Sequence, residues 1–132
     1  MHRLAVLAPL ALLAGCATYQ NAPIVENGPA APVGTAVALG QPVEVIAGSV
    51  VATPMAVVED SRCPENARCV WAGRLVVTTR IDGSGWRETA DLTLGEPVEV
   101  RGARLALVSG LPERQADRET PPGEYRFVYE AR

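Results

Sequence analysis

The chain has 132 residues and a formal net charge of −3 at pH 7. This length suits one small domain, and no basic patch of the size that nucleic-acid binding requires is visible in the sequence. The only histidine is His2, so the rest of the chain lacks the residue that Ser-His-Asp and Cys-His catalysis and most zinc sites use. We therefore expect no nucleic-acid partner, no metal site and no cofactor.

The first residues have the features of a secretory signal. Arg3 gives a basic start, and residues 4–15 form an apolar run of 12 residues, which is shorter than the roughly 20 that span a bilayer. The run ends in "LAGC", which resembles a bacterial lipobox. The resemblance implies cleavage before Cys16 and attachment of diacylglycerol and palmitate to this residue. Ala17, where inner-membrane lipoproteins have aspartate, resembles the pattern of lipoproteins sorted to the outer membrane of Gram-negative bacteria.

These features predict three parts: a signal peptide over residues 1–15, a lipidated and flexible tether over residues 16–35, and a β domain over residues 36–132. The tether is rich in alanine, proline, glycine and asparagine and has no sustained apolar period, as is typical of linkers. We expect the mature protein to be lipid-anchored in the cell envelope, on the periplasmic face of the outer membrane.

Short strands are predicted from residue 42 onward. Residues 42–48, 49–53 and 55–60 form three β-type runs, with a tight connection at Gly48-Ser49. The next run, residues 73–95, is typical of a hairpin that turns at residues 82–85.

In this hairpin, a register with Ile81 opposite Trp86 and Leu75 opposite Leu92 gives one mostly apolar and one mostly polar face.

A second hairpin is predicted from residues 96–100 and 103–109, across Arg101-Gly102. Residues 110–123 form a polar stretch without β or helical period. In the last run, residues 124–132, tyrosine and phenylalanine alternate with other residues, which predicts a terminal strand with its rings packed inward. Seven or eight short strands without a helical segment predict an all-β fold, an antiparallel, Ig-like β-sandwich.

The segment "DSRCPENARCVWAGR", residues 60–74, allows four interpretations: a metal knuckle, a redox site, a ligand loop or a structural staple. Two cysteines without histidine do not make a structural zinc site. The Cys-x5-Cys spacing with Pro64 inside also differs from the Cys-x-x-Cys of redox sites. With Cys16 carrying lipid, Cys63 and Cys69 remain as a pair, and in an oxidising compartment such a pair forms a disulfide.

The same segment resembles a group of small, uncharacterised bacterial secreted proteins and lipoproteins that share an Asp-Ser-Arg-Cys-Pro…Cys-Val-Trp-Ala-Gly core. The "LTLG" of residues 92–95 and the closing "GEYRFVYEA" are similar to that group as well. The resemblance covers residues from about 40 to 131. It implies architecture and compartment but no activity.

Two compatible roles remain for this segment. In the structural interpretation, the disulfide staples a strand-to-strand connection and Trp71 lies over the bridge as part of the core. In the functional interpretation, the stapled loop binds a partner, with Asp60, Arg62, Arg68 and Trp71 as candidate contacts.

We therefore expect a non-enzymatic binding or structural module that meets an envelope partner through the Cys63–Cys69 loop. The alternative is a periplasmic inhibitor of a protease or lytic enzyme that uses the same loop. A carboxylate-dependent hydrolase is less favoured, because neighbouring residues such as Glu59 and Asp60 point to opposite faces of a strand.

Overall fold

The computed structural model describes residues 28–132. The predicted signal peptide, the lipidation site Cys16 and residues 16–27 of the predicted tether lie outside the described residues. Within the described part, no helix is long and apolar enough to cross a membrane.

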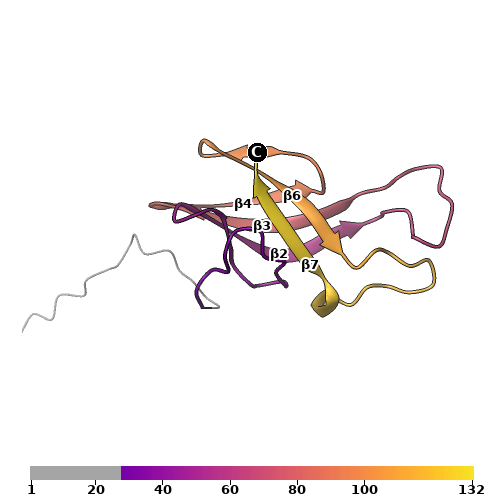
Figure 1. Ribbon diagram of the computed structural model, residues 1–132. Helices are drawn as coiled ribbons and strands as arrows, with labels where there is room; N and C mark the ends of the chain where they lie inside the picture. The colour runs from indigo at the N-terminus through magenta and orange to yellow at the C-terminus, as the bar shows by residue number, and fades with distance from the viewer. Residues whose placement is uncertain (1–27) are drawn as a thin grey trace, which may run out of the picture.

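Seven strands form two antiparallel sheets (Figure 1). The four-stranded sheet has the order β1-β2-β3-β4 and the three-stranded sheet the order β5-β6-β7, so the described strands of each sheet follow one another as a meander. The prediction of an all-β, two-sheet fold with seven or eight strands is confirmed. The elements are β1 (Val43–Ile46), β2 (Val50–Asp60), β3 (Leu75–Gly83), β4 (Trp86–Thr93), β5 (Val98–Val100), β6 (Ala103–Leu111), the short 3-10 helix η1 (Pro122–Glu124) and β7 (Arg126–Ala131).

The core lies between the two sheets, because alternate residues of each strand point to the same face. The predicted inward ring face of the last strand is confirmed: Tyr125, Phe127 and Tyr129 are buried, and the first two rings stack with centroids 5.6 Å apart. The Tyr129 hydroxyl meets the Thr79 hydroxyl at 2.9 Å and so gives each buried group a partner in the opposite sheet. Burial raises the pKa of Tyr129 above its ordinary value. The largest fully buried aliphatic side chains are Val37, Val43, Leu75, Val77, Ile81, Leu92, Leu105 and Leu107.

The β3–β4 hairpin exists, but its register differs by two residues from the predicted one. Ile81 lies opposite Glu88, and Gly83 opposite Trp86, so the turn is the tight Ser84-Gly85 pair. The predicted faces are correct, because a shift by two leaves every side chain on its side of the sheet. The Trp86 ring lies against Gly83, where a Cβ would collide with it.

Glu88 lies on the core-side face of β4, in the predicted register as in the observed one, and its partner accounts for its place there. Its carboxylate accepts a hydrogen bond of 2.7 Å from Arg101 in the β5–β6 turn and so links the two sheets at their margin. The β5–β6 hairpin across Arg101-Gly102 is confirmed, with Val100 opposite Ala103.

The two strands predicted over residues 49–53 and 55–60 are one long strand, β2. Pro54 does not end the strand. β1 pairs with β2 only as far as Ala52, so beyond this residue the edge of β2 toward β1 makes no strand-to-strand hydrogen bonds in the described part of the chain. A proline there removes no hydrogen bond from the sheet. Two irregularities in the pairing with β3 leave Met55 and Val58 as extra residues. Both side chains are exposed.

Ordered contacts begin before residue 36, where we expected the domain to start. Ala31 donates to the Pro42 carbonyl and accepts from the Glu44 amide, both at 2.9 Å. Val37 and Phe127 exchange two backbone hydrogen bonds of 2.9 Å. The segment from residue 31 to residue 37 therefore joins the edge of one sheet, β1, to the edge of the other, β7.

Candidate functional site

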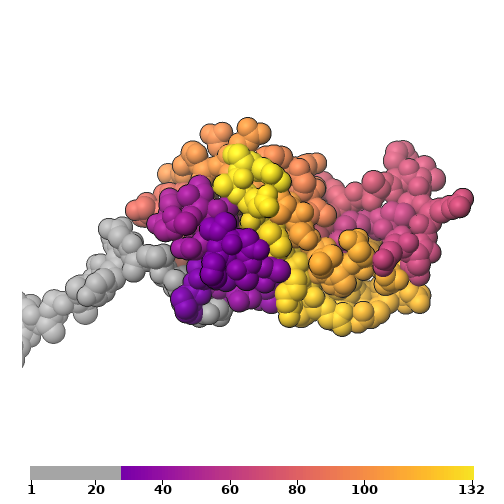
Figure 2. All heavy atoms as spheres, viewed as in Figure 1, coloured from indigo at the N-terminus to yellow at the C-terminus, as the bar shows by residue number. Residues whose placement is uncertain are grey.

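The cysteine loop connects β2 to β3 and projects from one end of the molecule (Figure 2). The predicted disulfide is confirmed: Cys63 and Cys69 are bonded, with their Cα atoms 5.7 Å apart. The two sides of the loop also pair through their backbones, since the Cys63 amide donates to the Ala72 carbonyl at 2.9 Å. Gly73 has a φ of 66° and lies so close to Ser61 that a Cβ would collide with the Ser61 oxygen, which is why this position requires glycine.

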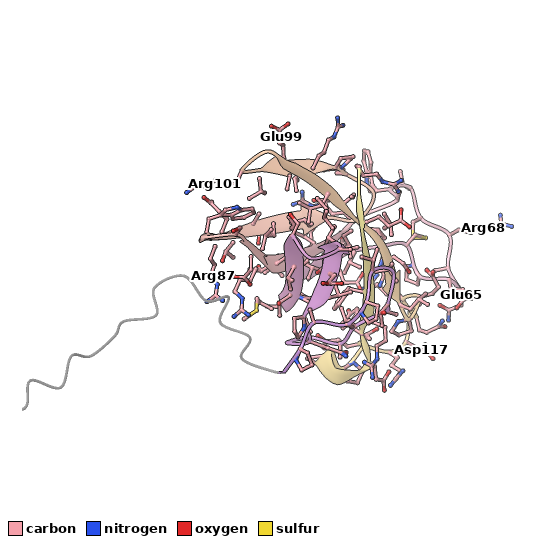
Figure 3. All side chains as sticks on the ribbon, turned by 60° about the vertical axis from the view of Figure 1, so that its left-hand side comes forward. Glu65, Arg68, Arg87, Glu99, Arg101 and Asp117 are labelled. Carbon is pink, nitrogen blue, oxygen red and sulfur yellow. A yellow bond between two sulfur atoms is a disulfide. The ribbon has the colours of Figure 1, made fainter. Side chains whose placement is uncertain are left out.

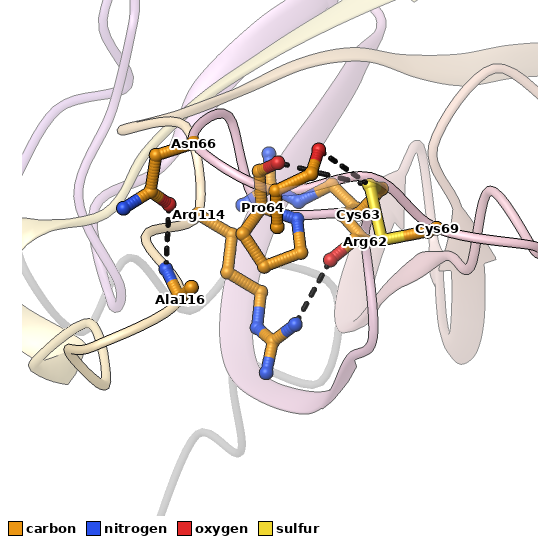
Figure 4. The surroundings of a disulfide bond; sticks show 8 residues. Arg62, Cys63, Pro64, Asn66, Cys69, Arg114 and Ala116 are labelled. Atoms are coloured by element: carbon orange, nitrogen blue, oxygen red, sulfur yellow. Dashed lines mark hydrogen bonds between the residues drawn. A yellow bond between two sulfur atoms is a disulfide. The ribbon is translucent and has the colours of Figure 1, made fainter.

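The first part of the loop, residues 62–66, is bound to the body of the protein, and we call it the clamped limb. Its partners lie in the stretch after β6 (Figure 4). The Glu65 amide donates to the Arg114 carbonyl at 2.8 Å, and the Asn66 side chain accepts from the Ala116 amide at 2.9 Å. A third bond runs from the Arg114 guanidinium to the Arg62 carbonyl at 3.0 Å. These bonds fix one side of the loop to the connection between β6 and η1.

Asp60 and Arg62 form the centre of a network at the base of the clamped limb. The guanidinium donates to both Asp60 oxygens at 2.8 Å, the bidentate geometry that gives the strongest ion pairs. It also donates to the Gly110 carbonyl at 2.7 Å and to the Pro112 carbonyl at 3.2 Å. Tyr125 donates its hydroxyl hydrogen to Asp60 at 2.7 Å. One ion pair thus holds the end of β2, the end of β6 and the start of β7 together.

The network changes the acid–base properties of its members. Burial alone would raise the pKa of Asp60, but hydrogen bonds from Arg62 and Tyr125 and the positive charge of Arg62 lower it below its ordinary value. The hydrogen bond to Asp60 raises the pKa of Arg62. Burial and the bond to Asp60 raise the pKa of Tyr125. At neutral pH the pair is therefore charged, and Tyr125 keeps its proton.

Asp60 and Arg62, two of the candidate contact residues, lie largely inside the fold. The Asp60 and Arg62 side chains are only 10% and 12% exposed, and the guanidinium points toward carbonyl groups of the opposite sheet rather than outward. Their charged groups are therefore bonded within the domain. The reason lies in the tertiary structure, because the carbonyl acceptors come from residues 48 and 50 positions later in the chain.

The second part of the loop, residues 67–72, has the opposite character, and we call it the free limb. Val70 and Trp71 are 90% and 80% exposed. Figure 3 shows Arg68 pointing away from the body of the protein, and within residues 28–132 its side chain makes no hydrogen bond or ion pair. The prediction that Trp71 belongs to the core is wrong, because the loop extends past the end of both sheets and no core lies beneath the ring.

A groove of about 910 Å³ lies beside the end of β2. One wall is residues 57–60 of β2, the other is residues 114–122 after β6, and Tyr125 completes the lining. The sequence predicted the second wall only as a polar stretch and gave no signal for the groove, since its two walls are more than fifty residues apart in the chain.

Two of the carboxylates that line the groove are already paired: Asp60 bonds to Arg62 and Tyr125, and Glu59 pairs with Arg74. Among residues 28–132, no group of three or more histidine, cysteine, aspartate or glutamate side chains could hold a metal ion.

No protein-family model, curated protein or solved structure matches this chain. The assignment of a function therefore depends on the geometry of the domain alone.

Proposed function

We propose that the protein is a lipid-anchored module of the bacterial cell envelope that binds a partner protein through the free limb of its cysteine loop. The observation that supports this proposal is the exposure of Val70 and Trp71, at 90% and 80%. Two adjacent large apolar side chains at a projecting tip cost solvation free energy in the isolated protein. Contact with a partner would recover this free energy.

The loop has the properties of an efficient binding element. The disulfide and the clamped limb fix the backbone on both sides of Arg68, so little conformational entropy is left to lose on binding. Tryptophan and arginine are also the residue types that contribute most to protein–protein interfaces. Arg68 adds a positive charge that would favour an acidic surface on the partner.

The position of the loop is compatible with anchoring at the other side of the domain. In Figures 1 and 3, the described chain begins in the half of the molecule opposite the cysteine loop. A lipid on Cys16, which precedes this point in the chain, would leave the free limb facing away from the membrane. We place the anchor in the outer membrane, with the domain in the periplasm, and assign the domain no catalytic role.

A photoreactive amino acid at position 70 tests the binding proposal in intact cells. Thr89, exposed on β4, is the matched control position. We expect one discrete adduct from position 70, none from position 89, and loss of the adduct in Trp71→Ala. Equal labelling from both positions, or no adduct from either, would contradict the proposal.

The anchor has its own test. Labelling of cells with radioactive palmitate should mark the protein, and Cys16→Ser should remove the label and release the protein from the membrane fraction. A label that persists in Cys16→Ser would contradict the assignment of Cys16.

A second candidate function is inhibition of a periplasmic protease or lytic enzyme. The projecting position of the cysteine loop, in which the disulfide closes residues 63–69, favours it, because a projecting loop fits an enzyme cleft. Titration of trypsin and of lysozyme with the purified protein tests two enzyme classes. We expect inhibition of one of them that is lost in Arg68→Ala, and activity that is unchanged at a tenfold excess would contradict this alternative for both.

A further inference from the structure

Strand β2 is much longer than the strand that pairs with its outer side. β1 pairs with Val50, Val51 and Ala52, whereas β3 pairs with β2 as far as Asp60. From Met55 to Asp60, no other strand within residues 28–132 lies on the outer edge. Alternate backbone N–H and C=O groups of a strand point to each edge, so this stretch offers hydrogen-bonding groups to an additional strand.

The outer edge faces the groove. Residues 57–60 form one wall, and residues 114–122 face them across it. The clamped limb holds the second wall in place through Glu65. The Glu65 amide donates to the Arg114 carbonyl, and the Glu65 carboxylate accepts a hydrogen bond of 2.6 Å from the Gln115 side chain. The volume of about 910 Å³ is near the upper end of the roughly 300–1,000 Å³ typical of small-molecule sites. A short extended segment therefore has room between the two walls.

The charges of the groove favour a basic occupant. Its lining contains four carboxylates and two arginines. Three of these charges are paired, Glu59 with Arg74, Asp60 with Arg62 and Arg118 with Glu124, whereas Arg114 donates to the Arg62 carbonyl and keeps its charge. Asp117 and Glu119 are exposed and make no hydrogen bond or ion pair within residues 28–132. A second copy of the same edge would bring the same carboxylates together and is disfavoured.

We propose that the groove is a binding site for an extended, basic polypeptide segment, which adds as a strand to the outer edge of Met55–Asp60. Arginine or lysine side chains at alternate positions of this segment lie toward Asp117 and Glu119, and apolar side chains lie against Val57 and Val58. This is recognition by β-augmentation, in which the backbone supplies affinity and alternate side chains supply specificity. The site is separate from the free limb, so it does not depend on the function proposed for the loop.

The irregularities of β2 set the limits of this site. The Pro54 carbonyl already accepts a hydrogen bond of 2.7 Å from the Gly40 amide, so the available edge begins after this residue. The extra residues Met55 and Val58 turn the strand locally. A segment of about five residues, roughly 17 Å long, therefore matches the available edge.

A peptide titration followed by NMR tests the proposal with the full chain carrying Cys16→Ser, which is purified without lipid. The probe is the peptide Gly-Arg-Val-Arg-Val-Arg-Gly, and the control is the same peptide with glutamate in place of arginine. We expect saturable shifts of the amide signals of Met55–Asp60 and of residues 114–120 with the basic peptide, and none with the acidic one. No shift of these signals at 1 mM basic peptide, or shifts confined to the free limb, would overturn the proposal.

Backbone methylation separates strand addition from simple charge attraction. In one peptide the arginine amides are N-methylated and in another the valine amides, so that each loses the donors of one edge. A segment that pairs with β2 through one edge is expected to tolerate one pattern and to lose binding at least tenfold with the other. Equal affinity of both methylated peptides would overturn strand addition.

Charge neutralisation identifies the acidic wall. Asp117→Asn combined with Glu119→Gln should weaken binding of the basic peptide at least fivefold. The matched control combines Glu99→Gln and Glu130→Gln, two exposed carboxylates elsewhere on the domain, and should leave affinity unchanged. An equal loss in both double variants would show only an effect of net charge and would overturn the assignment of Asp117 and Glu119.

Discussion

The two limbs of the cysteine loop are joined by a disulfide but differ in their contacts with the rest of the domain and in their exposure to solvent. The clamped limb meets the chain after β6 through the backbone of Glu65 and the side chain of Asn66. In the free limb, Val70 and Trp71 are exposed to solvent. A disulfide can therefore fix the shape of a loop without placing the loop in the core. The clamped limb is structural because residues after β6 bond to it.

The largest effect on this comparison is expected from Arg62→Ala in the clamped limb. It removes the partner of the largely buried Asp60 carboxylate and leaves the Gly110 carbonyl without its donor. The free energy of unfolding should fall by about 3 kcal/mol, since breaking a buried pair from one side costs roughly that much. Urea denaturation measures it.

The matched control is Arg68→Ala in the free limb, which should change the free energy of unfolding by less than about 0.5 kcal/mol. Similar losses in both variants would show that the two limbs do not differ as described.

The next effect is that of the disulfide itself. Cys63→Ser combined with Cys69→Ser should lower the free energy of unfolding by roughly 2.4 kcal/mol, the chain-entropy value for a loop of about seven residues. In hydrogen exchange, the amides of residues 67–72 should exchange faster, while the Glu65 amide keeps its protection because its acceptor is Arg114. Uniform loss of protection over both limbs would mean that the clamp depends on the disulfide.

A smaller effect is expected from acid. The folded pKa of Asp60 is lower than its value in the unfolded chain, so its contribution to stability is fully present above the unfolded pKa and is lost as the pH falls through the folded one. Urea midpoints between pH 6 and pH 2 should therefore decrease, and Asp60→Asn should make the decrease smaller. An unchanged slope in Asp60→Asn would remove Asp60 as the titrating group.

The smallest effect on stability is expected from Trp71→Ala, within about 0.5 kcal/mol, because an exposed side chain loses little packing. Trp86→Ala is the matched comparison and should cost more, since Trp86 packs against Gly83 and the core. Thermal unfolding of both variants measures the difference. A loss of stability in Trp71→Ala larger than that in Trp86→Ala would show that the Trp71 side chain has a structural role.

Much of the fold was predictable from local patterns. The alternation of apolar and polar residues identified the inward faces of β3 and β7, and Arg101-Gly102 identified a turn. The register of β3 against β4 was not predictable in the same way, because the tight Ser84-Gly85 turn and a longer turn differ by two residues and give identical faces.

The candidate site was less predictable. The cysteine count indicated the disulfide, since Cys63 and Cys69 are the only cysteines after the lipobox. The sequence could not show which side of the loop would be buried. The position of Trp71 just after the disulfide predicted a core residue, with a partner contact as the alternative, and Arg62 was a candidate contact. In the structure Trp71 is exposed and the Arg62 side chain is largely buried.

The class of fold, the inward faces of the strands and the covalent closure of the loop were predictable from the sequence, because they follow from period-two alternation, turn residues and cysteine parity. Which loop side chains are buried and which are exposed depends on the tertiary structure. The Arg62 guanidinium donates to carbonyls that lie 48 and 50 positions later in the chain, and Asp60 accepts from the hydroxyl of Tyr125, 65 positions later. The Trp71 ring meets no such neighbour, because the packing of two sheets places an opposite strand beneath Arg62 and only solvent beneath Trp71.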